Sequence, residues 1–257
     1  MVNLKEITDF LFSIAPVCLA EDYDNVGLLV ESESTEIESV LISLDTDNKV
    51  VSEAQKKGCD MVISHHPLIF KPMKKIKKDD AVFSLVKNNI ALFAMHTNYD
   101  AVQGGLCDAL LKKICDCKDI FPLASEEADS IGRIAQLKEE VEFSDFCENV
   151  KKVLGIDSLK IVGDKAKKIK TIAICNGGGA DFVYDAKGKG ADLYISGDFK
   201  YHHARFCYEN DMALLELTHY DAEIIFIDVL AQMIEKEFEG KLKVFKSEEN
   251  INPWKTV

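Results

Sequence analysis

The chain has 257 residues, 47% of them apolar and 29% charged, with a formal net charge of −13. This composition is typical of a globular protein with a well-buried core, and the acidic balance argues against a general affinity for nucleic acid or an anionic membrane. Eight cysteines without a C-x-x-C pair indicate reduced thiols in a cytoplasmic protein, and a first apolar run broken by Ser13 and Pro16 predicts neither a signal peptide nor a membrane span.

The first part of the chain predicts one helix and then alternating strands and helices. Asn3, with Glu6 three residues later, forms a capping-box pattern, and apolar residues at helical spacing extend from it to about residue 15. An acidic turn at 21–25 follows. Its acids could face the cavity, although solvated turn side chains are the simpler interpretation. Periodicity then predicts, in order, a strand at 40–45, a helix at 47–57, a strand at 60–64, a helix at 80–87 and a strand at 90–96.

The strand at 60–64 ends in two adjacent histidines, with Pro67 closing off its continuation. Neighbouring residues of a strand point to opposite faces, so both imidazoles turn towards one cavity more easily just beyond the strand. All six histidines of the chain follow or end a predicted apolar strand, in four clusters: His65 and His66, His96, His202 and His203, and His219. Histidines that serve only packing would be more scattered, and this distribution therefore indicates a metal site.

The second half of the chain repeats the first. A constant offset of 132 residues carries the strand at 40–42 to 172–174 and the segment 57–60 to 189–192. We therefore predict an α/β fold of two similar halves that arose by internal duplication, with helices layered on mixed sheets. The predicted domains are 1–120 and 121–257.

The carboxyl ends of the predicted strands collect metal-binding side chains, and ligands of open α/β sheets bind at such ends. His219 and Glu223 are four residues apart in a stretch of helical periodicity, so both lie on one helix face and can share an ion. Five ligands exceed the needs of one tetrahedral ion with an open position, and we predict two divalent ions of zinc, manganese, iron or cobalt between the halves. The predicted ligands are His65, His66, Asp100, His219 and Glu223.

Two such ions, about 3.5–4 Å apart and bridged by Glu223 and a water, would lower the pKa of that water and create a hydroxide nucleophile. His96 is predicted to be a catalytic residue beside the ligands, with metal ligand and buried strand-end histidine as alternatives. His202 and His203 are predicted to face the rim of the cavity. The stretch 176–180 is either a phosphate cradle or a plain tight turn, and the lysine-rich loop 71–78 is either solvated or attracts an anionic substrate.

Five motifs spread along the chain carry a resemblance to a known family: DNVGL at 24–28, SHHPLIF at 64–70, HTNYD at 96–100, GDFKYH at 197–202 and HYDAE at 219–223. They resemble motifs of the dinuclear metal-centre proteins known as homologues of GTP cyclohydrolase I type 2 and related to the NGG-interacting factor. The resemblance implies two metal ions on the five ligands named above, a duplicated α/β fold and assembly as a toroidal homohexamer.

Site chemistry and resemblance together predict a metal-dependent hydrolase that acts on a small anionic, nucleotide-like substrate. Both cyclohydrolase and phosphoesterase reactions are compatible with the ligand set. The competing prediction is a protein without turnover, either a metal carrier or a ring-shaped scaffold for a partner. A carrier should release its ions readily to an acceptor, and a hydrolase should retain them and turn over.

Overall fold

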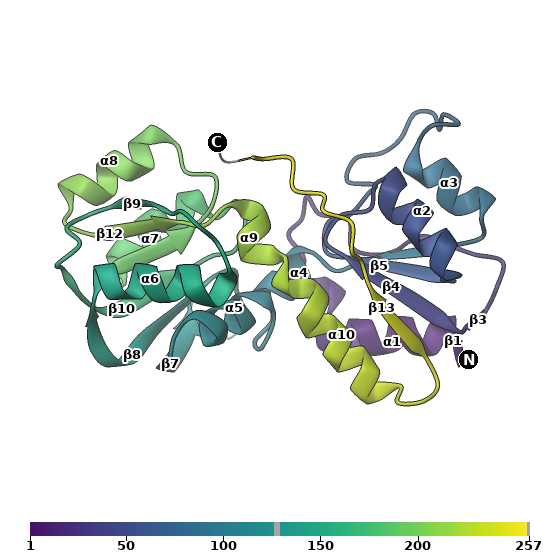
Figure 1. The fold of residues 1–257 in the computed structure, drawn as a ribbon, viewed down its shortest axis with the longest axis horizontal. Coiled ribbons are helices and arrows are strands. Elements are labelled where there is room, and N and C mark those ends of the chain that lie inside the picture. Colours follow the sequence, from purple (N-terminus) through teal and green to yellow (C-terminus); the bar gives the residue numbers. More distant parts are fainter. Residues whose placement is uncertain (126–128, 256–257) are drawn as a thin grey trace. The chain divides into compact units, whose positions relative to one another are not determined.

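The computed structural model describes residues 1–125 and 129–255, which form two compact units (Figure 1). The first unit contains Met1–Tyr99 and Phe226–Val257, and the second contains Asp100–Ile225. These units divide the chain differently from the predicted domains 1–120 and 121–257. Residues 100–120 belong to the second unit, and the last part of the chain returns to the first. Among the described residues, none of the helices has the length and apolar character needed to cross a bilayer.

The first unit is built on a five-stranded sheet in the order β13-β4-β5-β6-β2. All neighbouring strands are parallel except β2, which runs antiparallel to β6. The strands are β2 (Gly27–Val30), β4 (Ser39–Ser43), β5 (Met61–Ser64), β6 (Ala91–Ala94) and β13 (Lys243–Lys246), and a small separate pair joins β1 (Val2–Asn3) to β3 (Glu36–Ile37).

Helices cover both faces of this sheet (Figure 1). On one face α2 (Asn48–Lys57) and α3 (Ala81–Lys87) pack on Leu41, Val62 and Leu92. On the other face the ring of Phe12 lies 5.1 Å from that of Phe93. The elements of that face are α1 (Leu4–Ile14), the short η1 (Val17–Leu19) and α10 (Ile225–Glu237).

The ends of the first two predicted helices follow their sequence signals. The side chain of Asn3 accepts a hydrogen bond from the amide of Lys5 at 3.0 Å, as an N-cap should, and α1 ends just before Pro16. The side chain of Asp47 caps α2, which ends at Gly58 with a φ of 67°. The predictions for 3–15 and 47–57 are confirmed.

The second unit is built on a six-stranded sheet in the order β7-β8-β10-β11-β12-β9, whose central strands β10, β11 and β12 are parallel. Its strands are β7 (Cys117–Pro122), β8 (Arg133–Glu142), β9 (Lys160–Val162), β10 (Lys168–Ile174), β11 (Leu193–Ser196) and β12 (Ala213–Glu216). Its helices are α5 (Leu106–Ile114), α6 (Phe143–Leu154), η2 (Ala180–Phe182), α7 (Val183–Gly188), α8 (Tyr201–Glu209) and α9 (His219–Glu223), while α4 (Thr97–Ala101) contains the boundary between the units.

The core of the second unit lies between the sheet and α7 and α8, where Ala173, Tyr194 and Leu214 are buried together with side chains of the two helices. The α5 and α6 helices lie on the opposite face of the sheet (Figure 1). Helices therefore cover both faces of a mixed sheet in each unit, and the predicted α/β fold class is confirmed.

The repeat in the sequence corresponds to a repeat in strand register. Val40 pairs with Met61 between β4 and β5, and Ile172 pairs with Leu193 between β10 and β11, so both partners are displaced by 132 residues. The turn before the second strand is also the same in both copies. Asp60 accepts hydrogen bonds from the amides of residues 38 and 39 at 2.8 and 3.1 Å, and Asp192 accepts them from residues 170 and 171 at 2.9 and 2.8 Å.

The last part of the chain belongs to the first unit because it adds a strand to that sheet. β13 pairs in parallel with β4, with Val244 opposite Val40. Beyond the strand, the carboxylate of Glu53 accepts hydrogen bonds from the Ser247 hydroxyl at 2.6 Å and from the Glu248 amide at 2.9 Å. These contacts fasten residues 243–248 to β4 and α2, which lie near the start of the chain.

Candidate metal centre

The paired histidines follow β5, the central strand of the first unit's sheet. Backbone pairing continues past the strand, since the amides of His65 and His66 donate to the carbonyls of Ser43 at 3.3 Å and Leu44 at 2.9 Å. Pro67 has no amide hydrogen and cannot extend this pairing. The two imidazole rings nevertheless lie 5.1 Å apart between centroids. The irregular backbone after the strand therefore brings both rings together, as the sequence predicts.

Hydrogen bonds decide which ring nitrogen of each histidine can bind a metal. Nδ1 of His65 lies 2.7 Å from the carbonyl oxygen of Met95, and Nδ1 of His66 lies 2.9 Å from a carboxylate oxygen of Asp45. Carbonyl and carboxylate oxygens only accept hydrogen bonds, so in both neutral rings Nδ1 carries the proton and donates it. The lone pair then resides on Nε2, which is the usual arrangement of a metal-binding histidine.

His96 has the same orientation as the paired histidines. Its Nδ1 donates to Asp24 at 2.9 Å, and Asp24 also accepts a hydrogen bond from the Thr97 amide at 3.0 Å. The Asp24 side chain is inaccessible to solvent. Burial opposes its ionisation, but hydrogen bonds from His96 and Thr97 and the attraction of His96 outweigh that effect and hold the pKa of Asp24 at about 2. For Asp24, the interpretation of 21–25 as a solvated turn is wrong.

The three histidines of the first unit form one cluster. One ligand atom from each of His65, His66 and His96 lies within 4.8 Å of the others. The ring of His65 is wholly buried and also packs on Phe226 at 5.1 Å. Burial and hydrogen bonding together therefore position this cluster, and the donor set of imidazole nitrogens fits a divalent transition metal such as zinc.

The second unit supplies a histidine and a carboxylate on one short helix. The Thr218 hydroxyl caps α9 by accepting from the amide of Asp221 at 3.1 Å. His219 and Glu223 then lie one turn apart, with Nε2 3.1 Å from a carboxylate oxygen. The prediction that these two side chains share a helix face is confirmed.

Nδ1 of His219 donates to Asp198 at 2.8 Å, so in the neutral ring Nε2 presents a lone pair towards the oxygen of Glu223. Two acceptors at this separation repel unless a proton or a cation bridges them. The side chain of Glu223 is only 4% exposed, so water screens this repulsion weakly. The pair therefore has the chemistry of a cation site.

The glycine-rich turn after β10 closes over this pair. A Cβ at Gly177 would lie 2.1 Å from a Glu223 carboxylate oxygen and 2.8 Å from Nε2 of His219. Gly177 also has a φ of +56°, which a residue without a side chain adopts most readily. Within the second unit, the turn predicted for 176–180 thus packs on the candidate ligands themselves.

Asp100 lies near the end of α4 and is buried. Arg133 holds the end of this helix, since its guanidinium donates to the carbonyls of Ala101 at 2.9 Å and Val102 at 2.7 Å. The same group forms an ion pair with Asp108 at 2.7 Å, with both side chains almost inaccessible. Arg133 therefore fixes the backbone beside a predicted ligand, a role that no local pattern in the sequence indicates.

The surroundings of Cys175 in the second unit disfavour its thiolate form. The Cys175 thiol is hydrogen-bonded to Cys107 and fully buried, and the charges of Asp100 and Glu223 act on it as well. Each of these effects raises the pKa of Cys175 well above its ordinary value. All eight cysteines are free thiols, and the predicted ligand set of nitrogen and oxygen is consistent with this environment.

A second histidine cluster of the second unit differs from the first in its tautomer. Ligand atoms of Asp181, His202 and His203 also lie within 4.8 Å of one another. Nδ1 of His203, however, accepts a hydrogen bond from the amide of Lys200 at 3.1 Å, and Nε2 donates to Asp181 at 3.0 Å. To bind a metal through Nε2, this ring would have to move its proton to Nδ1 and lose the bond that begins α8. The cluster is therefore a helix-terminus contact.

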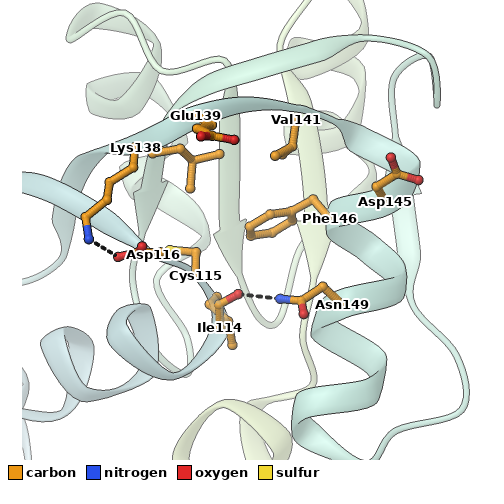
Figure 2. A pocket seen from close by; sticks show the side chains of 10 residues that line it. Ile114, Cys115, Asp116, Lys138, Glu139, Val141, Asp145, Phe146 and Asn149 are labelled. Carbon is orange, nitrogen blue, oxygen red and sulfur yellow. Dashed lines mark hydrogen bonds and ion pairs between the residues drawn. The ribbon is translucent and has the colours of Figure 1, made fainter.

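A cavity of about 330 Å³ lies between the end of α5, β8 and α6 of the second unit, and none of the predicted ligands lines it. Figure 2 shows Asn149 donating to the carbonyl of Ile114, at 2.7 Å, and Lys138 paired with Asp116, at 2.8 Å. Burial raises the pKa of the Cys115 thiol in its wall, so that thiol is not a ready nucleophile. The chemistry predicted from the sequence lies in the histidine clusters and not in this cavity.

The chain is similar over nearly its whole length to proteins of one family. The family model for Duf34/NIF3 (NGG1p interacting factor 3) matches residues 2–253. A Clostridium perfringens protein named GTP cyclohydrolase 1 type 2 homolog is 34% identical over 264 residues, covering all of both chains. NIF3-like protein 1 of Drosophila melanogaster is 32% identical over 265 residues, covering 99% of this chain and 88% of its own. A solved hypothetical protein of Staphylococcus aureus has 28% identity and a TM-score of 0.90, with 99% of each chain covered.

Proposed function

Because the chain belongs to the Duf34/NIF3 (NGG1p interacting factor 3) family, we propose that it is a metal-dependent hydrolase acting on a small anionic, nucleotide-like substrate. Its cofactor is two divalent ions of zinc, manganese, iron or cobalt. The proposed ligands are His65, His66, Asp100, His219 and Glu223.

One observation carries this proposal, namely the shared orientation of four imidazole rings. In each ring Nδ1 lies 2.7–2.9 Å from an oxygen acceptor, so in the neutral ring Nδ1 donates and Nε2 carries the lone pair. Outer acceptors of this kind orient metal-binding histidines and raise their basicity. The four rings and their acceptors are His65 with Met95, His66 with Asp45, His96 with Asp24 and His219 with Asp198.

When bound, divalent ions activate water as a nucleophile near neutral pH and polarise the group that it attacks. We assign proton transfer in this reaction to His96, through Nε2. Asp24, which accepts the proton of Nδ1, holds the ring in one tautomer and stabilises its charged form. Gly177 allows the backbone to approach Glu223 and His219 and limits the space around this pair.

The relatives' names and the basic loop at 71–78 support the proposed substrate class. Several curated relatives are named GTP cyclohydrolase 1 type 2 homolog, and we propose hydrolysis of either a purine-ring carbon or a phosphoester. The basic loop at 71–78 would attract such an anion. Both reactions need an ion to activate water, so metal loading comes first in any test.

The test is turnover by the full chain loaded separately with zinc, manganese and iron. GTP and a phosphodiester of 4-nitrophenol are the substrates, and we expect one of them to be hydrolysed. We expect His65→Ala to abolish turnover together with metal binding, and His202→Ala to leave the metal content unchanged. Absence of turnover with every ion on a fully loaded chain would refute the hydrolase. Rapid transfer of the ions to a chelating acceptor would then favour the metal carrier.

We also propose that the chain assembles as a homohexamer, as the resemblance implies. Light scattering coupled to size-exclusion chromatography measures the mass directly. A particle with the 28.7 kDa mass of one chain would contradict this assembly.

A further inference from the structure

The first unit contains three imidazoles that converge without any residue of the second unit. We propose that His65, His66 and His96 alone bind one divalent ion, so that the chain has a one-ion state in addition to the two-ion state. In this state His96 is a ligand, whereas proton transfer in the two-ion state uses the same nitrogen. The inference rests on the metal binding of the proposed function, but it does not require hydrolysis.

The spacing of the rings fits three ligands of one tetrahedral ion. With bonds of about 2.0–2.1 Å to nitrogen, each ring centroid lies about 3.2 Å from the ion, and tetrahedral angles then separate the centroids by about 5.2 Å. The observed separations are 5.1 Å for His65 and His66, 5.3 Å for His65 and His96, and 5.5 Å for His66 and His96. All three pairs therefore meet the spacing that a three-histidine site requires.

The orientation of the rings agrees with their spacing. In each neutral ring Nδ1 donates to a separate oxygen, on Met95, Asp45 or Asp24. The opposite nitrogen of each ring is therefore the one that presents its lone pair. The Asp181–His203 pair has similar proximity but the reverse tautomer, which makes it a control within the same molecule.

The ligand type selects the class of ion. Three neutral imidazoles suit zinc or cobalt better than magnesium or calcium, which prefer oxygen ligands. Three protein ligands also leave one tetrahedral position open. The proposed site would therefore hold an ion that still accepts a further ligand, as expected for a state with only one ion bound.

The experiment removes the second unit's ligands from the full chain and counts the remaining ions. In the triple variant Asp100→Asn, His219→Ala, Glu223→Gln we expect one zinc ion per chain after equilibrium dialysis, against two for the unchanged protein. Adding His96→Ala should weaken the remaining site by more than about 100-fold, since even outer-shell changes cost 10–100-fold in affinity. With cobalt, the visible spectrum of the triple variant should indicate tetrahedral coordination, and His96→Ala should abolish that signal.

Two further variants separate ligation from folding. Asp24→Asn keeps an acceptor for His96 but removes its charge, and we expect it to weaken cobalt binding in the triple variant by about 10-fold. His202→Ala should leave the cobalt affinity within twofold. Thermal unfolding of each variant shows whether a loss of metal binding results from a loss of folded structure. If His96→Ala fails to fold, the cobalt affinity of Asp24→Asn decides the question.

The outcomes distinguish this inference from the proposed function. A triple variant that keeps no ion, or one whose affinity is unchanged by His96→Ala, overturns the one-ion site even if the unchanged protein hydrolyses a substrate. A triple variant that keeps one tetrahedral cobalt ion supports the site even if the unchanged protein has no turnover. Metal counting therefore decides the inference, and turnover decides only the proposed function.

Discussion

The two copies of the repeated β-α-β unit share one backbone frame and end in different chemistry. β4 pairs with β5 in the same register as β10 with β11, and an aspartate fastens the turn before the second strand in both. After β5 the chain continues with His65 and His66, whereas the corresponding positions after β11 are Gly197 and Asp198. The frame fixes where side chains emerge, and residue type then decides whether a position supplies a ligand.

The second copy uses these positions to support a ligand from another element. Asp198, which corresponds to His66, accepts the Nδ1 proton of His219 at 2.8 Å. Gly197, which corresponds to His65, lies so close to the carbonyls of Gly177 and Leu217 that a Cβ would be 2.7 and 2.9 Å from them. The first copy thus provides imidazoles at the strand end, and the second provides the carboxylate that orients one.

The short helices α4 and α9 extend the correspondence, since both have five residues and follow the third parallel strand of their unit. Their ends are held differently. A side-chain cap on Thr218 begins α9, whereas the buried guanidinium of Arg133 binds the carbonyls at the end of α4. A substitution that removes the Thr218 cap or the Arg133 hydrogen bonds should therefore disturb the short helix of only one copy.

Arg133→Met should have the largest effect on stability. The substitution leaves the Asp108 carboxylate buried without its partner and removes the donors to the end of α4. We expect the free energy of unfolding to fall by about 3–5 kcal/mol, measured by urea unfolding followed by circular dichroism. The exposed Lys138–Asp116 pair provides the matched control, and Lys138→Met should cost less than about 1 kcal/mol. Equal losses in the two variants would contradict the role given to Arg133.

Gly197→Ala should have the next largest effect on stability. It tests the position where the second copy has Gly197 and the first copy has His65. The new methyl group would press on backbone carbonyls, which cannot turn away as a flexible side chain can. We expect a loss of about 3 kcal/mol in the free energy of unfolding. Gly190→Ala is the control, because Gly190 has a φ of +77° but no atom within 4 Å of an added Cβ, and it should cost about 1 kcal/mol. A similar cost at both positions would contradict crowding by these carbonyls as the reason for glycine at position 197.

The repeated frame could be predicted from the sequence because its signals are local. Capping by Asn3, the left-handed glycine at Gly58 and the apolar periodicity of the parallel strands all act within a few residues. The offset of 132 residues predicts two similar halves, and the structure adds that their strands pair in the same register. The edge strands β9 and β13 were not predicted. They are short, and their place depends on pairing with strands far away in the chain.

The residues around the ligands were harder to predict than the ligands. The histidine clusters at strand ends indicated a metal site, and His65, His66 and His96 do lie together in the first unit. Their partners carry no such signal. Asp24 resembles a solvated turn residue until His96, 72 positions later, donates to it, and Arg133 is recognisable only by its contacts with Asp108 and the end of α4. Long-range hydrogen bonds give these residues their roles, and a single sequence does not encode such partners locally.

The smallest expected effect is a pH dependence of the free energy of unfolding. It distinguishes the Asp24–His96 pair from the Asp198–His219 pair. Asp24 is inaccessible and has a pKa of about 2, below its usual 3.8, so its ionised form is favoured in the folded state. A lowered pKa stabilises the fold above pH 3.8, and this stabilisation, about 2 kcal/mol at 1.36 kcal/mol for each pKa unit, is lost as the pH falls through 2.

Asp24→Asn should therefore flatten the stability of the protein between pH 4 and pH 2, measured as the urea midpoint at each pH. The side chain of Asp198 is 59% exposed in its pair with His219, and solvent screens such a pair. Asp198→Asn should consequently leave the slope of stability against pH unchanged, although both substitutions remove a carboxylate that orients an imidazole. If both variants flatten the curve equally, burial is not what distinguishes the two pairs. If only Asp24→Asn does so, the first copy holds its histidine through a buried charge and the second through an exposed one.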